Sequence, residues 1–156
     1  MSIADRNIFR ALPCDNRLIV LYSKGQMPKN HPKIMIIDDE RDFADMLKTR
    51  LEHHGYNVLA LSDAKYVIRE LHSFVPDVIL LDLLMPGAGG LDAAEMLNSD
   101  PIGANIPIIV ISGLSKDADK VKAYKLGIAD YLVKPIDTDA LLASIEKSIR
   151  AKSAED

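Results

Sequence analysis

The sequence contains one cysteine, Cys14, no tryptophan, and few aromatic residues, which make up 5% of the chain. A single cysteine excludes an intrachain disulfide, so we expect a cytoplasmic protein and not a disulfide-stabilised secreted domain. No apolar run reaches the roughly 18 residues that a membrane-spanning helix needs. The first residues, MSIADR, also lack the basic start and the apolar stretch of a signal peptide.

Charge of one sign is not concentrated anywhere in the sequence. The chain has 19 Lys and Arg against 23 Asp and Glu, a net charge of −4, and its basic residues are scattered. This distribution argues against direct binding of nucleic acid. What remains is the ordinary composition of a globular protein, with 48% hydrophobic and 27% charged residues. Its 156 residues suit one domain with a core, with room for a short extension.

The stretch VILLDLLMPGAGG, residues 78–90, organises the rest of the chain. Four consecutive apolar residues predict a strand buried on both faces, as in parallel sheets. Asp82 follows at once, and a segment rich in Pro and Gly then leaves the sheet. An acid in this place lies where open α/β sheets bind ligands, although a lone aspartate is more often a helix cap or a turn residue.

Apolar strands alternate with amphipathic helices from Lys33 onwards. Strands are expected at residues 34–37, 58–61, 78–81, 107–111 and 131–133. Helices are expected at about residues 43–51, 63–71, 91–97, 116–126 and 137–151. This alternation predicts an α/β fold, a doubly wound five-stranded parallel sheet in the order 2-1-3-4-5 with helices on both faces.

The first 31 residues do not follow this pattern. Residues 3–12 predict a short helix, residues 17–22 a strand, and residues 23–32 a polar linker with Gly and Pro. We therefore expect an N-terminal extension at 1–31, a folded domain at 32–152 and a short tail at 153–156. An isolated apolar strand at residues 18–22 would also offer an edge to another sheet or to a second copy of the chain.

The residues that end the parallel strands are expected to share one edge of the sheet. They are Asp38 and Asp39 after the first strand, Asp82 after the third, Ser112 at the end of the fourth and Lys134 after the fifth. Three carboxylates repel one another unless a cation lies among them, and an all-oxygen site favours Mg²⁺ over Ca²⁺. An ammonium and a hydroxyl suit a phosphoryl group, and a carboxylate is able to act as its nucleophile.

Each of these residues, taken singly, also has a plain structural explanation. Asp38, Asp39 and Ser112 are suitable helix caps, and Lys134 is a suitable surface lysine. Their joint placement on one edge is what indicates a site that binds Mg²⁺ and a phosphoryl group.

Four motifs resemble those of one known family. They are Ile-Ile-Asp38-Asp39-Glu40, Leu-Leu-Asp82-Leu-Leu-Met85-Pro86 with Gly90, Ile-Ser112-Gly113, and Asp130-Tyr131-Leu-Val-Lys134-Pro135. Over about residues 32–152 the chain resembles the receiver domain of two-component response regulators. The resemblance implies the flavodoxin-like, three-layer receiver fold and a phosphoacceptor role in a two-component or phosphorelay pathway.

The resemblance also implies a role for each site residue. Asp82 would take a phosphoryl group from the phosphohistidine of a sensor histidine kinase or a phosphotransfer protein. Mg²⁺ would be bound by Asp39, Asp82 and the backbone carbonyl of Leu84, and Asp38 would hold its waters. Ser112 and Lys134 would bind the phosphoryl oxygens.

A switch is implied by the same resemblance. On phosphorylation Ser112 would move inward and Tyr131 would follow it from an exposed to a buried position. This would change the face made by the fourth helix, the fifth strand and the fifth helix, where a downstream effector protein would bind. The bond between Lys134 and Pro135 would be cis.

The sequence departs from the family pattern at two positions. Leu84 and Leu114, two residues after Asp82 and Ser112, are apolar where polar groups of the family help to place the hydrolytic water. We therefore expect slow loss of the phosphoryl group. Gly113 fits the family's preference for a small residue beside the phosphate.

Two other functions stay open. A phosphatase of the haloacid dehalogenase type also uses an Asp nucleophile, Mg²⁺, a Ser or Thr and a Lys, but Leu84 stands where its second acid would be. A pseudo-receiver would keep the fold as a binding scaffold without phosphorylation, although all five site residues are present.

Only five residues follow Ala151. If the chain is complete, output is expected through protein contacts and not through catalysis beyond the domain's own phosphoryl transfer; if it is a piece of a longer protein, an output domain lies elsewhere. A homodimer also stays open, either through the fourth and fifth helices or through the strand at residues 18–22.

Overall fold

The computed structural model describes residues 31–87 and 89–155. Its strands are β1 (Lys33–Ile37), β2 (Asn57–Leu61), β3 (Val78–Leu81), β4 (Ile108–Ser112) and β5 (Asp130–Val133). Its α-helices are α3 (Arg41–His53), α4 (Val67–Phe74), α5 (Gly90–Ser99), α6 (Asp117–Lys125) and α7 (Thr138–Glu155). Short 3₁₀ helices, η2 (Ala64–Tyr66) and η3 (Gly103–Asn105), precede α4 and β4. The helix predicted at residues 3–12 and the strand predicted at 17–22 lie outside the described residues.

The strands form one parallel sheet in the order β2-β1-β3-β4-β5, which confirms the order predicted from the sequence. All residues of β3 and β4 are buried, as the continuous apolar runs predicted. Strand β1 pairs with β2 on one side and with β3 on the other, so the order reverses between β1 and β3. This reversal is the switch point at which open α/β sheets bind their ligands.

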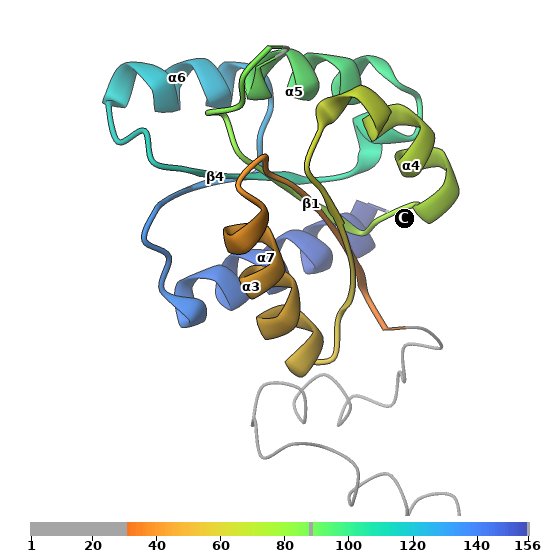
Figure 1. The fold of residues 1–156 in the computed structure, drawn as a ribbon. Helices are drawn as coiled ribbons and strands as arrows, with labels where there is room; N and C mark the ends of the chain where they lie inside the picture. Colours follow the sequence, from red (N-terminus) through yellow and green to blue (C-terminus); the bar gives the residue numbers. More distant parts are fainter. Residues whose placement is uncertain (1–30, 88, 156) are drawn as a thin grey trace, which may run out of the picture. The chain divides into compact units, whose positions relative to one another are not determined.

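Helices cover both faces of the sheet, giving three layers (Figure 1). On one face α4, α5 and α6 pack against the strand residues Met35, Ile37, Ile79 and Val110. On the other face α3 and α7 pack against Ile34, Ile36, Leu80 and Ile109. Alternate strand residues therefore belong to two separate hydrophobic clusters, because successive side chains of a strand point to opposite faces.

Helix α7 is longer than predicted from the sequence. It continues to Glu155 and so includes most of the segment expected to be a tail at residues 153–156. The amphipathic pattern ends near Ile149, but Ser153 Oγ donates to the carbonyl oxygen of Ile149, 3.0 Å away, one turn back. Lys152 Nζ lies 3.9 Å from Asp77 Oδ1. These polar contacts continue the helix where apolar periodicity no longer indicates it. Among the described residues, no helix is long and apolar enough to cross a membrane.

Candidate functional site

Backbone hydrogen bonds continue past the ends of the central strands and fix the residues that follow them. Asp38 N donates to Leu61 O at 3.0 Å, and Asp82 N donates to Ile37 O at 2.9 Å. Lys134 N donates to Ser112 O, also at 2.9 Å. The backbone hydrogen bonds of the sheet therefore fix the positions of the residues that carry the side chains of the site.

Three carboxylates meet at this edge. Oxygen atoms of Asp38, Asp39 and Asp82 all lie within 4.8 Å of one another. Asp38 is 2% exposed and Asp82 is 4% exposed, whereas Asp39 is open to solvent. Oδ1 of Asp38 accepts a hydrogen bond from Glu40 N at 2.9 Å, and Oδ1 of Asp82 accepts one from Leu84 N at 3.0 Å. Each of the two buried carboxylates is thus held through one oxygen.

The ammonium group of Lys134 binds the other oxygens. Its Nζ lies 2.8 Å from Asp38 Oδ2 and 3.4 Å from Asp82 Oδ2. Burial lowers the pKa of Lys134, but the hydrogen bond to Asp38 and the charges of Asp82 and Asp38 outweigh it, so its pKa lies above the ordinary value. Lys134 therefore carries a positive charge between the two carboxylates. The bond from Lys134 to Pro135 is cis.

One cation does not fully compensate this cluster. Burial and the charge of Asp82 raise the pKa of Asp38 above its ordinary value, even though Lys134 and the backbone of Glu40 act in the opposite direction. A carboxylate in this position gains from an additional positive charge nearby. The donors are all oxygen atoms, and one of the three carboxylates is open to solvent. This donor set fits a hard divalent ion such as Mg²⁺, which retains several waters.

Ser112 and Tyr131 are joined through the backbone of Leu114. Ser112 is fully buried, and its Oγ accepts a hydrogen bond from Leu114 N at 3.3 Å. The hydroxyl of Tyr131 donates to Leu114 O at 2.8 Å. Tyr131 is 8% exposed, so the structure holds the buried arrangement of this ring. Burial raises the pKa of Tyr131, as do the charges of Asp119 and Asp82, although the nearby Ser112 hydroxyl acts in the opposite direction.

Two contacts of the site are not indicated by the sequence. Gly90 was seen only as part of a motif, but a Cβ at this position would collide with the backbone of Asp82 and Leu83. Phe43 begins the helix expected at residues 43–51, and its ring centroid lies 4.1 Å from Lys134 Nζ. The first contact depends on the path of the loop between β3 and α5, and the second joins elements distant in the sequence, so no local pattern indicates either of them.

A hollow of about 560 Å³ borders the acidic cluster. Asp39, Arg41, Tyr66 and Met85 are among the residues that line it. This hollow lies next to the one carboxylate of the cluster that is open to solvent. It therefore lies beside the acidic cluster on the side of Asp39.

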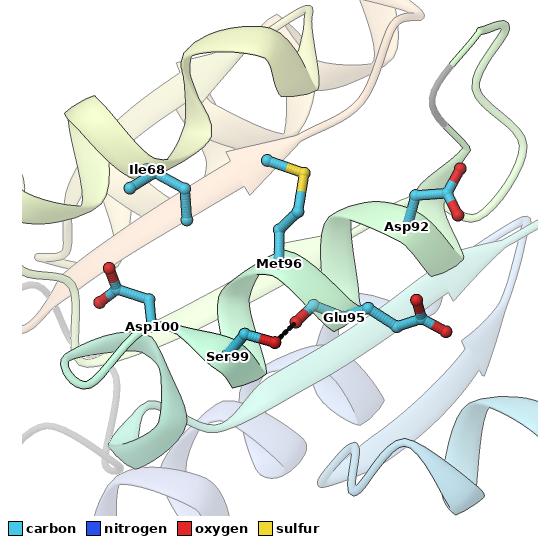
Figure 2. A pocket seen from close by; sticks show the side chains of 6 residues that line it. All are labelled: Ile68, Asp92, Glu95, Met96, Ser99 and Asp100. Carbon is cyan, nitrogen blue, oxygen red and sulfur yellow. Dashed lines mark hydrogen bonds between the residues drawn. The ribbon is translucent and has the colours of Figure 1, made fainter.

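Another hollow, of about 510 Å³, lies between α4 and α5 (Figure 2). It is lined by Ile68, Asp92, Glu95, Met96, Ser99 and Asp100. In Figure 2 the Met96 side chain reaches from α5 toward α4, and Ser99 Oγ bonds the carbonyl oxygen of Glu95 within the same helix. None of the predicted site residues lines this hollow, so the candidate site is at the strand ends.

Comparison with known proteins gives the same picture. A family model described as the response regulator receiver domain matches residues 34–146. A probable transcriptional regulator of Guillardia theta, ycf27, is 35% identical over 118 residues, which cover 76% of this chain and 45% of that protein. The chain thus spans less than half the length of this curated relative.

Solved structures of receiver domains have the same fold. The signal receiver domain of a modulated diguanylate cyclase from Desulfovibrio desulfuricans G20 is 32% identical, with a TM-score of 0.73 over 81% of this chain and 100% of that chain. A CheY-like receiver domain protein from Methanospirillum hungatei JF-1 has a TM-score of 0.75 over the same shares, and its 22% identity supports the fold alone.

The family match, the sheet order and the cluster at the switch point agree with the resemblance seen in the sequence. The matched residues run from β1 into α7 and include every strand-end residue of the candidate site. The chain belongs to the response regulator receiver domains of two-component systems.

Proposed function

We propose that Asp82 accepts a phosphoryl group from the phosphohistidine of a sensor histidine kinase or a phosphotransfer protein. The observation that carries this proposal is the buried Asp82 carboxylate with Lys134 Nζ at 3.4 Å and with oxygens of Asp38 and Asp39 within 4.8 Å. An ammonium on one side and an acidic cation site on the other are what a phosphoryl acceptor needs. We assign the receiver domain to residues 32–152 and the exchange to the cytoplasm.

The transfer forms one bond and breaks one. An oxygen of Asp82 attacks phosphorus, the P–N bond to the donor imidazole breaks, and the imidazole nitrogen keeps the electron pair and takes up a proton. Leu84 N already holds Oδ1 of Asp82, while Oδ2 faces Lys134. Asp82 is therefore oriented before the donor arrives, which lowers the entropic part of the barrier.

Residues around Asp82 would bind the cofactor and the transferred group. Asp39, Asp82 and the carbonyl of Leu84 would hold Mg²⁺, and Asp38 would hold its waters. When bound, this ion neutralises negative charge that builds up on the phosphoryl oxygens. Lys134 would turn one N–H from Asp82 to a phosphoryl oxygen.

Ser112 would supply a hydroxyl donor to another phosphoryl oxygen. It would have to exchange its present contact with Leu114 N for this one. Since the Tyr131 hydroxyl is hydrogen-bonded to Leu114 O, a shift of the loop after β4 would also change the position of the Tyr131 ring. Ser112 and Tyr131 are therefore the proposed switch residues, and a phosphoryl group supplies the charge-assisted contacts that favour one loop arrangement.

The face made by α6, β5 and α7 is the proposed output surface. Helix α6 buries only Ala123 and exposes two large apolar side chains, Val121 at 51% and Tyr124 at 49%. A helix with so little buried surface can shift at small cost. Exposed aromatic and aliphatic side chains are also typical anchors for a downstream effector protein. In this role the domain is a switch, and its chemistry is limited to its own phosphoryl transfer.

The test is incubation with acetyl phosphate and Mg²⁺, followed by intact mass measurement. We expect one acid-stable, base-labile phosphoryl group on the unaltered protein and none on Asp82→Asn. Asp45→Asn, at an exposed position on α3, is the matched control and should be labelled normally.

Each other outcome of this experiment contradicts the proposal. Equal labelling of Asp82→Asn would remove Asp82 as the acceptor. No labelling at all would favour a pseudo-receiver scaffold, and continuous turnover of small phosphate esters would favour a phosphatase.

A further inference from the structure

The ring of Phe43 lies against the ammonium group of Lys134. Phe43 belongs to the first turn of α3, and Lys134 follows β5, so the contact joins opposite parts of the sequence. Nζ is 4.1 Å from the ring centroid. Phe43 is half-buried and packs on the hydrophobic cluster beneath α3 and α7, which holds the ring in place.

This is the shortest cation–ring contact among the residues that the structure describes. The others range from 4.7 Å, for Arg69 over Tyr66, to 6.0 Å, for Lys120 over Tyr131. Lys134 is also well shielded from water, with its side chain 17% exposed. Cation–π attraction is strongest when the cation is desolvated and close to the ring face, so Phe43 and Lys134 meet both conditions.

The ammonium group of Lys134 has to keep its position while its hydrogen-bond partners change. In the present structure its N–H groups point to Asp38 and Asp82. In the proposed reaction one of them has to turn to a phosphoryl oxygen. A ring face attracts the positive charge of the ammonium group as a whole, and this attraction does not require an N–H bond to point in a particular direction. The ammonium can therefore exchange hydrogen-bond partners while its position over Phe43 is kept.

The ring also favours the inward position of the lysine. Glu40 Oε2 lies 3.8 Å from Lys134 Nζ, but the Glu40 side chain is 66% exposed, so this ion pair holds the ammonium group only weakly. A lysine side chain has many rotamers and loses entropy when its ammonium group is held in one place. The attraction of the Phe43 ring, whose centroid lies 4.1 Å from Nζ, offsets part of this loss.

We infer that Phe43 is a positioning residue for Lys134, holding the ammonium group where it meets the incoming phosphoryl oxygens. The inference rests on the proposed phosphoryl transfer to Asp82. In this role Phe43 touches none of the reacting atoms and acts only through Lys134.

The test replaces Phe43 with monofluoro-, difluoro- and trifluorophenylalanine. Fluorine withdraws electron density from the ring face and weakens its attraction for a cation while the shape of the ring changes little. We expect the rate of labelling by acetyl phosphate to fall stepwise along the series, by about three- to tenfold in total.

The matched control is the same series at Phe74. Its ring lies 5.5 Å from Lys33 Nζ, at the opposite end of the sheet from the acidic cluster. Labelling should be unchanged by fluorination there. A flat series at Phe43 in a protein that is labelled normally would overturn the inference, and so would an equal fall at Phe74.

A second readout does not depend on phosphorylation. Protons of the Lys134 ε-methylene group should show an upfield ring-current shift in the NMR spectrum of the unphosphorylated protein. Phe43→Leu keeps an apolar side chain in the cluster and should abolish this shift. An unchanged shift in Phe43→Leu would show that the ammonium does not lie over the ring, which overturns the inference even if the proposed function holds. Failure of all labelling, with the shift present, would overturn the proposed function instead.

Discussion

The hydroxyl of Tyr131 donates a hydrogen bond to the carbonyl oxygen of Leu114 at 2.8 Å. The same residue, Leu114, donates its N–H to Ser112 Oγ. The backbone of Leu114, after β4, therefore connects the buried hydroxyl of Ser112 with the aromatic ring of Tyr131 in β5. A change in the hydrogen-bond partner of the Ser112 hydroxyl would therefore move Leu114 and, through it, Tyr131.

Replacement of Tyr131 by Phe keeps the buried ring and removes this hydrogen bond. We expect the free energy of unfolding to fall by about 1 kcal/mol, since an uncharged hydrogen bond contributes this much and Leu114 O loses its partner. Urea denaturation measures the change. Tyr124→Phe, on the exposed side of α6, is the control and should be nearly neutral. An unchanged free energy in Tyr131→Phe would contradict the role given to the Tyr131–Leu114 bond.

Replacement by alanine should lower the stability of the protein at Gly90 but not at Gly113. At Gly90 a Cβ would collide with the Asp82 carbonyl oxygen and the Leu83 Cα, so the backbone at Asp82 and Leu83 has to move. We expect Gly90→Ala to cost about 2 kcal/mol of stability and to slow labelling of Asp82. At Gly113 the nearest atom would be Leu84 Cδ1 at 3.7 Å, an ordinary contact. Equal thermal stability of the two variants would refute this comparison.

The strand-end residues could be predicted from the sequence because parallel strands all end on the same side. Apolar runs located β1, β3, β4 and β5, and the next polar residue of each was then known to reach one edge. The contact of Phe43 with Lys134 could not be predicted in this way. It depends on how far α3 is displaced along the sheet, which is decided by packing of the whole α3–α7 layer. The close approach of Gly90 to Asp82 depends likewise on the path of the loop between β3 and α5.

Mg²⁺ should stabilise the folded protein if the acidic cluster binds it. At a free concentration about ten times its dissociation constant, the free energy of unfolding should rise by about 1.4 kcal/mol. The rise should be lost in Asp39→Asn and kept in Asp45→Asn. It should also shrink as the pH falls toward the pKa of Asp38, which burial raises, because protons then compete for that carboxylate. A rise of the same size in Asp39→Asn would mean that Mg²⁺ binds elsewhere.

The contact between His72 and Asp100 should make stability depend on acid pH. Nε2 of His72 lies 2.7 Å from Asp100 Oδ2, and this hydrogen bond lowers the pKa of Asp100 below its ordinary value of 3.8. A carboxyl with a lowered folded-state pKa contributes its stability in full above the unfolded value and loses it as the pH falls through the folded value.

The free energy of unfolding of the unaltered protein should therefore differ from that of Asp100→Asn by the full amount near neutral pH. The difference should diminish below about pH 3.8. His72→Gln, followed in the same urea titrations, should show a smaller pH dependence than the unaltered protein. A difference between the unaltered protein and Asp100→Asn that stays constant into the acid range would rule out this linkage.

The phosphoryl group on Asp82 should be long-lived, with a half-life of many minutes or more. Leu84 is 51% exposed, and its Cδ1 would lie within 3.7 Å of a Cβ at Gly113, so the side chain extends toward the loop after β4. An apolar side chain there can neither accept a hydrogen bond from an attacking water nor orient it.

Leu84→Asn supplies a polar amide at this position. The substitution should shorten the half-life by about tenfold, which is a modest share of what a positioned polar group can contribute. Met96→Asn, also an exposed apolar position but on α5 away from the site, should leave the half-life unchanged. Decay can be followed by intact mass after removal of the donor, and a half-life of seconds in the unaltered protein would show that Leu84 does not protect the phosphoryl group.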